Sequence, residues 1–144
     1  MQLCYNSIES RSIYNMVLQN FTKIMLNFYD YLPPQCPPAD AFIPNNEEFF
    51  RVVSQPISTT DFIPTWLNKQ FPDEIMCQSR WLSLFMNKSE AKNILYLPSH
   101  RGQTIACGNL SSDHWVIKQT WGRYISHHTW RPYTNIDPTD IFHI

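Results

Sequence analysis

The feature that most constrains the fold is a proline-rich stretch in the first third of the chain. YLPPQCPPADAFIP, residues 31–44, holds five prolines. Proline fixes φ and lacks an amide donor, so neither a helix nor a central strand can run through this stretch. It predicts a rigid extended crossing, which we name the strap. A polyproline ligand for another protein is the alternative interpretation.

An amphipathic pattern precedes the strap. Between residues 13 and 28, apolar side chains recur at steps of three and four, and polar side chains fall largely on another face. This predicts an N-terminal helix within residues 1–30. A chain of this size needs buried area, which favours packing on its own domain. Docking onto a partner chain is the alternative.

Strand patterns alternate with turns after the strap. EFFRVV, residues 48–53, and SRWLSLF, residues 79–85, each place alternate side chains on opposite faces. The second leads into a helix that Asn87 and Glu90 begin as a capping box. Further along, QTIACGNL and WVIKQT are strands separated by the polar turn SSDH, which predicts a hairpin.

These elements predict an α+β fold with a single small mixed or antiparallel sheet, an N-terminal helix and one or two internal helices. The 144 residues suit one domain. We expect the helix at 1–30, the strap at 31–44, an α+β core at 45–133 and a polar tail at 134–144.

Composition excludes several classes of function. The formal net charge is -1, which does not suit a dedicated duplex-DNA binder. With three glycines and no GxGxxG or GxxxxGK, the usual phosphate-binding loops are absent. No apolar run is long enough to span a bilayer, and the start lacks the pattern of a secretory signal. The expected location is therefore cytoplasmic, with no membrane partner.

The four cysteines stand far apart, with no CxxC pair. They are Cys4, Cys36, Cys77 and Cys107. In a reducing compartment, this spacing predicts free thiols packed as small apolar groups. A zinc site built with histidines is the alternative, although metal ligands usually come in close pairs, so we expect no metal.

SHHTWRPY, residues 126–133, is the densest group of rings and cations. On an extended segment, His127 and His128 point to opposite sides, so they cannot easily share a metal. Trp130, Arg131 and Tyr133 have the composition of a protein-binding hot spot, and also of a stacking site for single-stranded nucleic acid. A packed corner of the core is the third interpretation, and general acid–base work by a histidine is the fourth.

Arg51 is the other candidate for binding. It interrupts an apolar strand face, where an unpaired charge is costly. Its expected partner is a carboxylate, from Asp61, Glu90 or Asp113, and an anionic ligand is the alternative. The expected binding residues are Arg51, His127, His128, Trp130, Arg131 and Tyr133.

Several segments together resemble a group of small, uncharacterised bacterial proteins. They are PPADAFIPNNEEFFRVV, the pair Asp61–Phe62, LSLF with the following helix that contains Ala91, and SHHTWRPY. The resemblance covers roughly residues 32–133 and implies a bacterial, intracellular origin.

A second pattern is similar to the start of ADP-ribosyltransferase-like folds, including RES-type toxins. It consists of Arg51 on a first strand, then Ser83 on a strand that leads into a helix. The resemblance implies that Arg51 holds the diphosphate or ribose of NAD and that Ser83 lies beside the nicotinamide. The later strands carry no Glu, which that family uses to stabilise charge on the ribose.

The sequence therefore predicts a non-catalytic accessory or regulatory protein that binds another macromolecule. A protein partner is expected first, with RNA or single-stranded DNA as the alternative. A bacterial assembly such as a phage-defence or toxin–antitoxin system is the expected setting. No cofactor and no enzymatic activity are predicted, and an NAD-using transferase toxin is the alternative function.

Overall fold

The computed structural model describes residues 36–64, 72, 77, 81–114, 116–120, 122–133 and 135–144. The chain divides into two units, Met1–Tyr31 and Leu32–Ile144, and all described residues belong to the second. The helix predicted within residues 1–30 lies outside the described residues.

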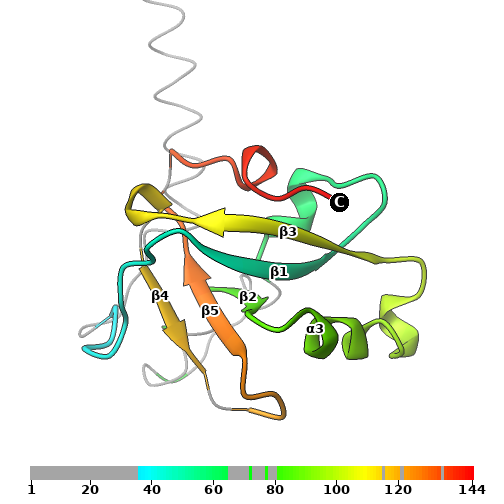
Figure 1. Cartoon of the computed structure of the whole chain (residues 1–144), viewed down its shortest axis with the longest axis horizontal. Helices are drawn as coiled ribbons and strands as arrows, with labels where there is room; N and C mark the ends of the chain where they lie inside the picture. Colours follow the sequence, from blue (N-terminus) through cyan, green and yellow to red (C-terminus); the bar gives the residue numbers. More distant parts are fainter. Residues whose placement is uncertain are drawn as a thin grey trace, which may run out of the picture. The chain divides into compact units, whose positions relative to one another are not determined.

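Five strands form one antiparallel sheet in the order β3-β1-β2-β5-β4 (Figure 1). Their bounds are β1 Glu47–Val53, β2 Leu82–Phe85, β3 Thr104–Leu110, β4 Val116–Gln119 and β5 His127–Arg131. Together with the helix α3, Lys88–Ile94, they give the described unit an α+β character. The strands predicted by alternation at 48–53 and 79–85 are therefore confirmed, with shifted ends.

The predicted hairpin between the third and fourth strands is wrong. β3 pairs with β1 along its whole length, from Thr104 opposite Val53 to Leu110 opposite Glu47. β4 pairs only with β5 and lies at the opposite edge of the sheet. The polar turn between them forms a short 3-10 turn, η3, Ser112–His114. A polar turn marks where one strand ends, but it does not determine which strand the next one pairs with. Here β3 pairs with β1, a distant strand of matching length.

One face of the sheet is covered by α3. The helix begins at Asn87, whose side chain accepts hydrogen bonds from the amides of Ser89 and Glu90 at 2.8 and 3.3 Å. Its fully buried residue Ala91 packs with Phe50 and Phe85 from the strands. The predicted helix start at Asn87 is confirmed, and packing of one apolar stripe on the sheet holds this short helix in place.

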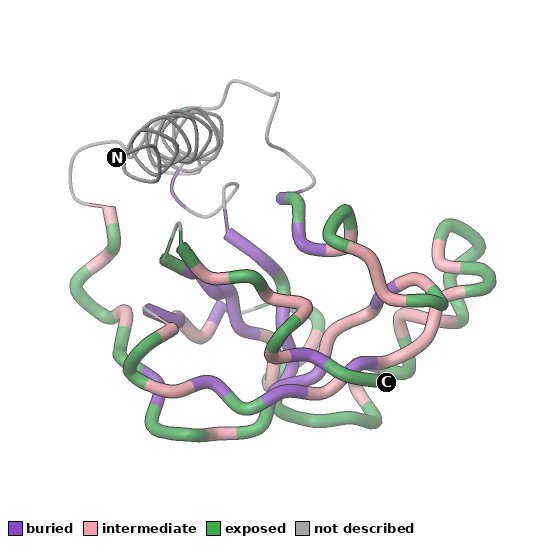
Figure 2. The backbone as a smooth tube through the Cα atoms, turned by 90° about the horizontal axis from the view of Figure 1, so that it is seen from above, coloured by how far each residue is buried: buried purple, intermediate pink, exposed green. Residues whose placement is uncertain are grey.

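The other face carries the larger core. Its fully or nearly fully buried members are Phe49, Val53, Phe62, Leu82, Leu84, Ala106, Leu110, Ile117, Trp130 and Phe142. Phe62 comes from the 3-10 turn η1, Thr59–Phe62, and Phe142 follows the turn η4, Pro138–Asp140. Figure 2 shows these buried stretches in purple, interrupted along the described backbone by intermediate and exposed ones. The segment expected as a polar tail, 134–144, thus supplies a fully buried ring to the core.

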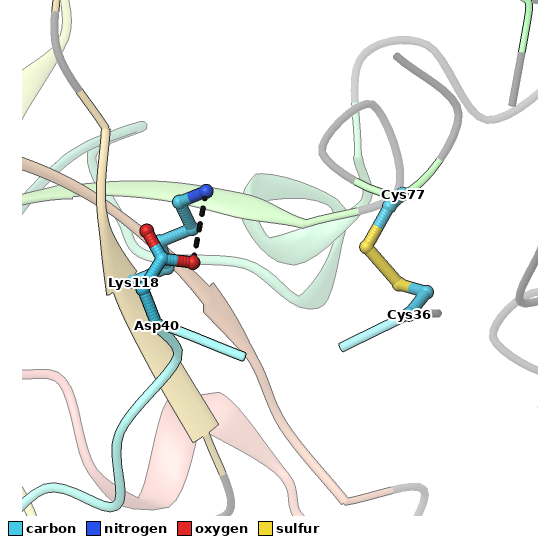
Figure 3. Close-up of a disulfide and its surroundings, with 4 residues drawn as sticks. All are labelled: Cys36, Asp40, Cys77 and Lys118. Atoms are coloured by element: carbon cyan, nitrogen blue, oxygen red, sulfur yellow. Dashed lines mark ion pairs between the residues drawn. A yellow bond between two sulfur atoms is a disulfide. The ribbon is translucent and has the colours of Figure 1, made fainter. Parts of the chain in front are cut away.

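A disulfide joins Cys36 to Cys77, with a Cα–Cα distance of 5.7 Å (Figure 3). The prediction that both are free thiols is wrong, because a sequence separation of 41 residues gives no sign that the fold brings them together. Cys107 is a free thiol, as predicted. Cys4 lies outside the described residues.

Candidate functional site

Most of the predicted binding cluster is interior structure. SHHTWRPY runs into β5, which lies between β2 and β4. Trp130 is fully buried, and its indole Nε1 donates a hydrogen bond to the carbonyl oxygen of His114 at 2.8 Å. Arg131 is only 3% exposed, whereas Tyr133 is 44% exposed. The structure therefore does not bring Trp130, Arg131 and Tyr133 together as one surface, because a central strand is buried on both faces.

The two histidines point to opposite faces, as predicted. His127 lies against Phe85 on the α3 face, with ring centroids 5.2 Å apart. His128 is buried and lies against Phe49 of the larger core at 5.5 Å. Each ring is thus an aromatic packing element on its own side of the sheet.

His127 has a hydrogen-bond partner within the hairpin that β4 and β5 form. Its Nδ1 lies 2.6 Å from the hydroxyl oxygen of Thr120. Burial lowers the pKa of His127 below its usual 6.5; a hydrogen bond with the backbone of Thr120 opposes this shift, and the neighbouring His128 adds to it. The neutral imidazole is therefore favoured at this position.

Ser126, the first residue of the stretch, joins the hairpin to α3. Its amide donates to the Glu90 carboxylate at 2.9 Å, and its hydroxyl donates to the same carboxylate. The hydroxyl oxygen also accepts from the Asn87 amide at 3.1 Å. In the predicted capping box, Glu90 would reach the Asn87 amide directly. Here the serine hydroxyl stands between them, so the cap is completed from the turn that precedes β5.

The Ser126 carbonyl fixes one histidine tautomer. It lies 2.7 Å from His128 Nδ1, and because a carbonyl oxygen only accepts, Nδ1 carries the proton. This hydrogen bond, like those of the Ser126 hydroxyl, stabilises the local turn. His128 therefore has a structural role here.

Arg51 is held by backbone carbonyls. Its Nε and Nη2 donate to the Asp61 carbonyl oxygen at 3.0 and 2.6 Å, and Nη1 donates to the Ser83 carbonyl oxygen at 2.6 Å. The guanidinium also lies over the Phe62 ring, 5.5 Å from its centroid. These hydrogen bonds go to the Asp61 carbonyl oxygen and not to the Asp61 carboxylate, which the sequence predicts as an ion-pair partner. Glu90 binds Ser126 and does not serve this role.

The Asp61 carboxylate organises its own turn. It accepts from the Ser54 amide and hydroxyl at 2.9 and 2.5 Å and from the Ser58 amide at 2.8 Å. Burial alone raises the pKa of Asp61, but the hydrogen bonds from Ser54 and Ser58 and the charge of Arg51 hold it below the usual 3.8. Arg51 contacts Ser83 only through the Ser83 carbonyl oxygen, and alternation along β1 and β2 places the two side chains on opposite faces of the sheet, so this contact does not form the arrangement that the transferase resemblance implies.

A cleft of about 440 Å³ lies along the outer edge of β3. Its lining includes the polar residues Asn109, His114, Asp140 and His143, together with Cys107. The main chains of Cys107 and His143 exchange hydrogen bonds of 2.8 and 2.9 Å, so the C-terminal segment pairs with β3 at this point of its outer edge. In the described part of the chain, no three His, Cys, Asp or Glu side chains gather closely enough to hold a metal.

A second feature is a basic and aromatic surface that the sequence interpretation missed. Lys88, Lys92, Tyr96, Leu97 and Arg101 are all exposed, and we name them the α3 surface. Tyr96 is 85% exposed and Leu97 43%. Lys88, Lys92 and Tyr96 follow one another at four-residue steps, which corresponds to about 6 Å along a helix. This spacing is the sequence pattern from which the surface could have been predicted.

The α3 surface rests on a continuous series of turns. After the helix, the amides of Leu97, His100 and Gln103 each bond to the carbonyl three residues before, at 3.1, 2.9 and 3.1 Å. None of Lys88, Lys92 and Arg101 lies within ion-pair distance of a described carboxylate. The surface thus presents cations beside an exposed ring, from one compact segment.

Comparisons with known protein families, with curated proteins and with solved structures gave no match. None of the helices in the described part of the chain has the length and apolar character needed to cross a bilayer. The fold and the α3 surface together define an α+β protein with a five-stranded antiparallel sheet and a strap that a disulfide holds. Its basic, aromatic surface lies on α3 and on the turns that follow it.

Proposed function

We propose that this protein is a non-catalytic accessory or regulatory module that binds an acidic surface of another protein. The α3 surface carries this proposal. A bacterial assembly such as a phage-defence or toxin–antitoxin system is the setting that we infer from the sequence resemblance, and the cytoplasm is the proposed location.

The composition of the α3 surface supports a protein partner. Tyr and Arg are the residues enriched at binding hot spots, and Leu97 adds apolar area beside Tyr96. Lys88 and Lys92 complement a carboxylate-rich partner and would steer its approach. Nucleic acid is less favoured because sequence-independent phosphate binding draws on many cations, and the whole chain has a formal charge of -1.

The test is quantitative capture from extracts of the native host with four forms of the full chain. The α3 variants are Lys92→Glu and Tyr96→Ala, and the matched control is Arg123→Glu, an exposed cation outside the α3 surface. We expect one protein partner to be retained by the wild type and by Arg123→Glu and to fall roughly tenfold or more with either α3 variant.

Two outcomes contradict the proposal. A partner retained equally by all four forms places the contact elsewhere. Binding of an oligothymidylate probe that declines steeply with salt and depends on Lys92 replaces the protein partner by a single-stranded nucleic acid.

The alternative function, an NAD-using transferase, rests on Arg51 and Ser83, which meet through a hydrogen bond of 2.6 Å from Nη1 to the Ser83 carbonyl oxygen. Nε, Nη1 and Nη2 of Arg51 each donate to a carbonyl oxygen, so a phosphate of NAD would have to compete with these hydrogen bonds. Release of nicotinamide from NAD by the wild type, lost in Arg51→Lys, would replace our proposal. No release by the wild type removes the alternative.

A further inference from the structure

The strap covers the outer edge of β4 through a small number of non-covalent contacts. Phe42 and Ile117 exchange backbone hydrogen bonds of 2.8 and 2.9 Å. Lys118 Nζ lies 3.2 Å from Asp40 Oδ1 (Figure 3). The Phe42 ring stands edge-on to His128, with centroids 6.2 Å apart.

These contacts are weak anchors on their own. The Asp40 side chain is 68% exposed, and exposed ion pairs contribute little because water screens them. Phe42 is 39% exposed, so its ring buries only part of its surface. Among the described strap residues, Pro44 is fully buried at the end that leads to β1, whereas along β4 the segment is held by the backbone pair between Phe42 and Ile117, because its prolines supply no amide donors.

The disulfide supplies the strong anchor at one end of the described strap. Cys77 is 9% exposed and packs with Trp81 and with Val116, the first residue of β4. Cys36 and Ala41 of the strap pack on the same cluster. The covalent bond therefore fixes the strap beside the strand whose edge it covers.

We propose that the Cys36–Cys77 disulfide is a redox-controlled clasp on this sheet edge. In the oxidised protein the strap lies closed over β4. In the reduced protein it leaves, and the N–H and C=O of Ile117 lose their backbone partner. The redox role rests on the cytoplasmic location proposed above, because a disulfide in a cytoplasmic protein is most often transient and redox-sensing. The clasp is independent of the α3 surface and of any partner bound there.

The chemistry requires a dithiol reductant. One of its thiolates attacks a sulfur of the Cys36–Cys77 bond and forms a mixed disulfide, which releases the other cysteine as a thiolate. The second reductant thiol then displaces the remaining cysteine. Two electrons and two protons pass to the protein, which ends with two thiols, while the reductant ends as a disulfide.

The test is amide exchange with water, detected by NMR within seconds, on the full chain before and after reduction. The reporter amides are Ile117 and Phe42, which bond only across the clasp. The control amide is Thr120, which bonds to the His127 carbonyl within the neighbouring hairpin at 3.0 Å. Reduction should speed exchange at both reporters by roughly tenfold or more beyond any change at Thr120, which senses the loss of stability of the whole unit.

Variants separate the clasp from other effects of the reductant. Cys36→Ser with Cys77→Ser should behave as the reduced wild type with or without reductant, and Cys107→Ser as the unchanged wild type. Reporters that stay protected with both thiols free would overturn the proposal. Exchange that accelerates equally at Ile117 and Thr120 would overturn it too, because the disulfide would then hold the whole unit and not one edge.

Discussion

Reducing the Cys36–Cys77 disulfide should lower the free energy of unfolding by about 4 kcal/mol. The bond joins positions 41 residues apart. For a loop of that length, the loss of denatured-state entropy on crosslinking corresponds to about 4 kcal/mol at 25 °C. This value counts only the constraint that the bond places on the unfolded chain, which the crosslink makes more compact.

Urea unfolding with and without a reductant measures this effect. With a slope of about 2 kcal/mol per molar urea, the midpoint should fall by about 2 M on reduction, and the slope should rise because the denatured chain becomes less compact. Cys36→Ser should reproduce the reduced midpoint, and Cys107→Ser should keep the oxidised one. A midpoint shift below about 0.5 M would refute the entropic reasoning, because the closed loop would then constrain the denatured chain very little.

Three further perturbations test the fold at single positions. Ser126→Ala removes the hydroxyl that joins the hairpin to α3 and should cost about 1–3 kcal/mol in chemical unfolding; an unchanged midpoint would show that water replaces it. Gly108→Ala places a Cβ 2.6 Å from the Ile141 carbonyl oxygen and should cost about 1–3 kcal/mol, whereas Gly122→Ala, in open space, should stay within about 1 kcal/mol. Because burial lowers the pKa of His127, the unfolded chain takes up a proton at this histidine before the folded chain does, so the free energy of unfolding should fall as the pH drops below 6.5. In His127→Gln this fall should be smaller. Equal pH profiles of the two forms would contradict the lowered pKa of His127.

Local patterns predicted most elements of the described fold. Alternation located β1 and β2, and the Asn87 cap located the start of α3. The pairing could not be predicted because β3 pairs with β1, more than 50 residues earlier, and the sequence between them contains another described strand, β2, and the helix α3. The disulfide was missed for the same reason, since only the folded chain brings Cys36 near Cys77.

The candidate site was predicted less well, because composition does not reveal exposure. Trp130 and Arg131 have the chemistry of contact residues, but Trp130 pairs with Leu82 on one side and with Ile117 on the other. A strand that is paired on both sides usually has its large side chains buried in the core. The α3 surface had a readable signal in the spacing of Lys88, Lys92 and Tyr96, but exposure of Tyr96 depends on how α3 lies on the sheet.

The position of β5 explains why rings and cations gather in SHHTWRPY. Ser126 ties the strand to α3, His128 lies between the strap ring of Phe42 and the core ring of Phe49, and Trp130 bonds to the turn at His114. One strand therefore connects helix, strap and core, and each bulky side chain serves a different junction. Substitutions there should reduce binding only as far as they unfold the unit, whereas Tyr96→Ala should reduce binding at unchanged stability, because that ring is 85% exposed and supports little packing.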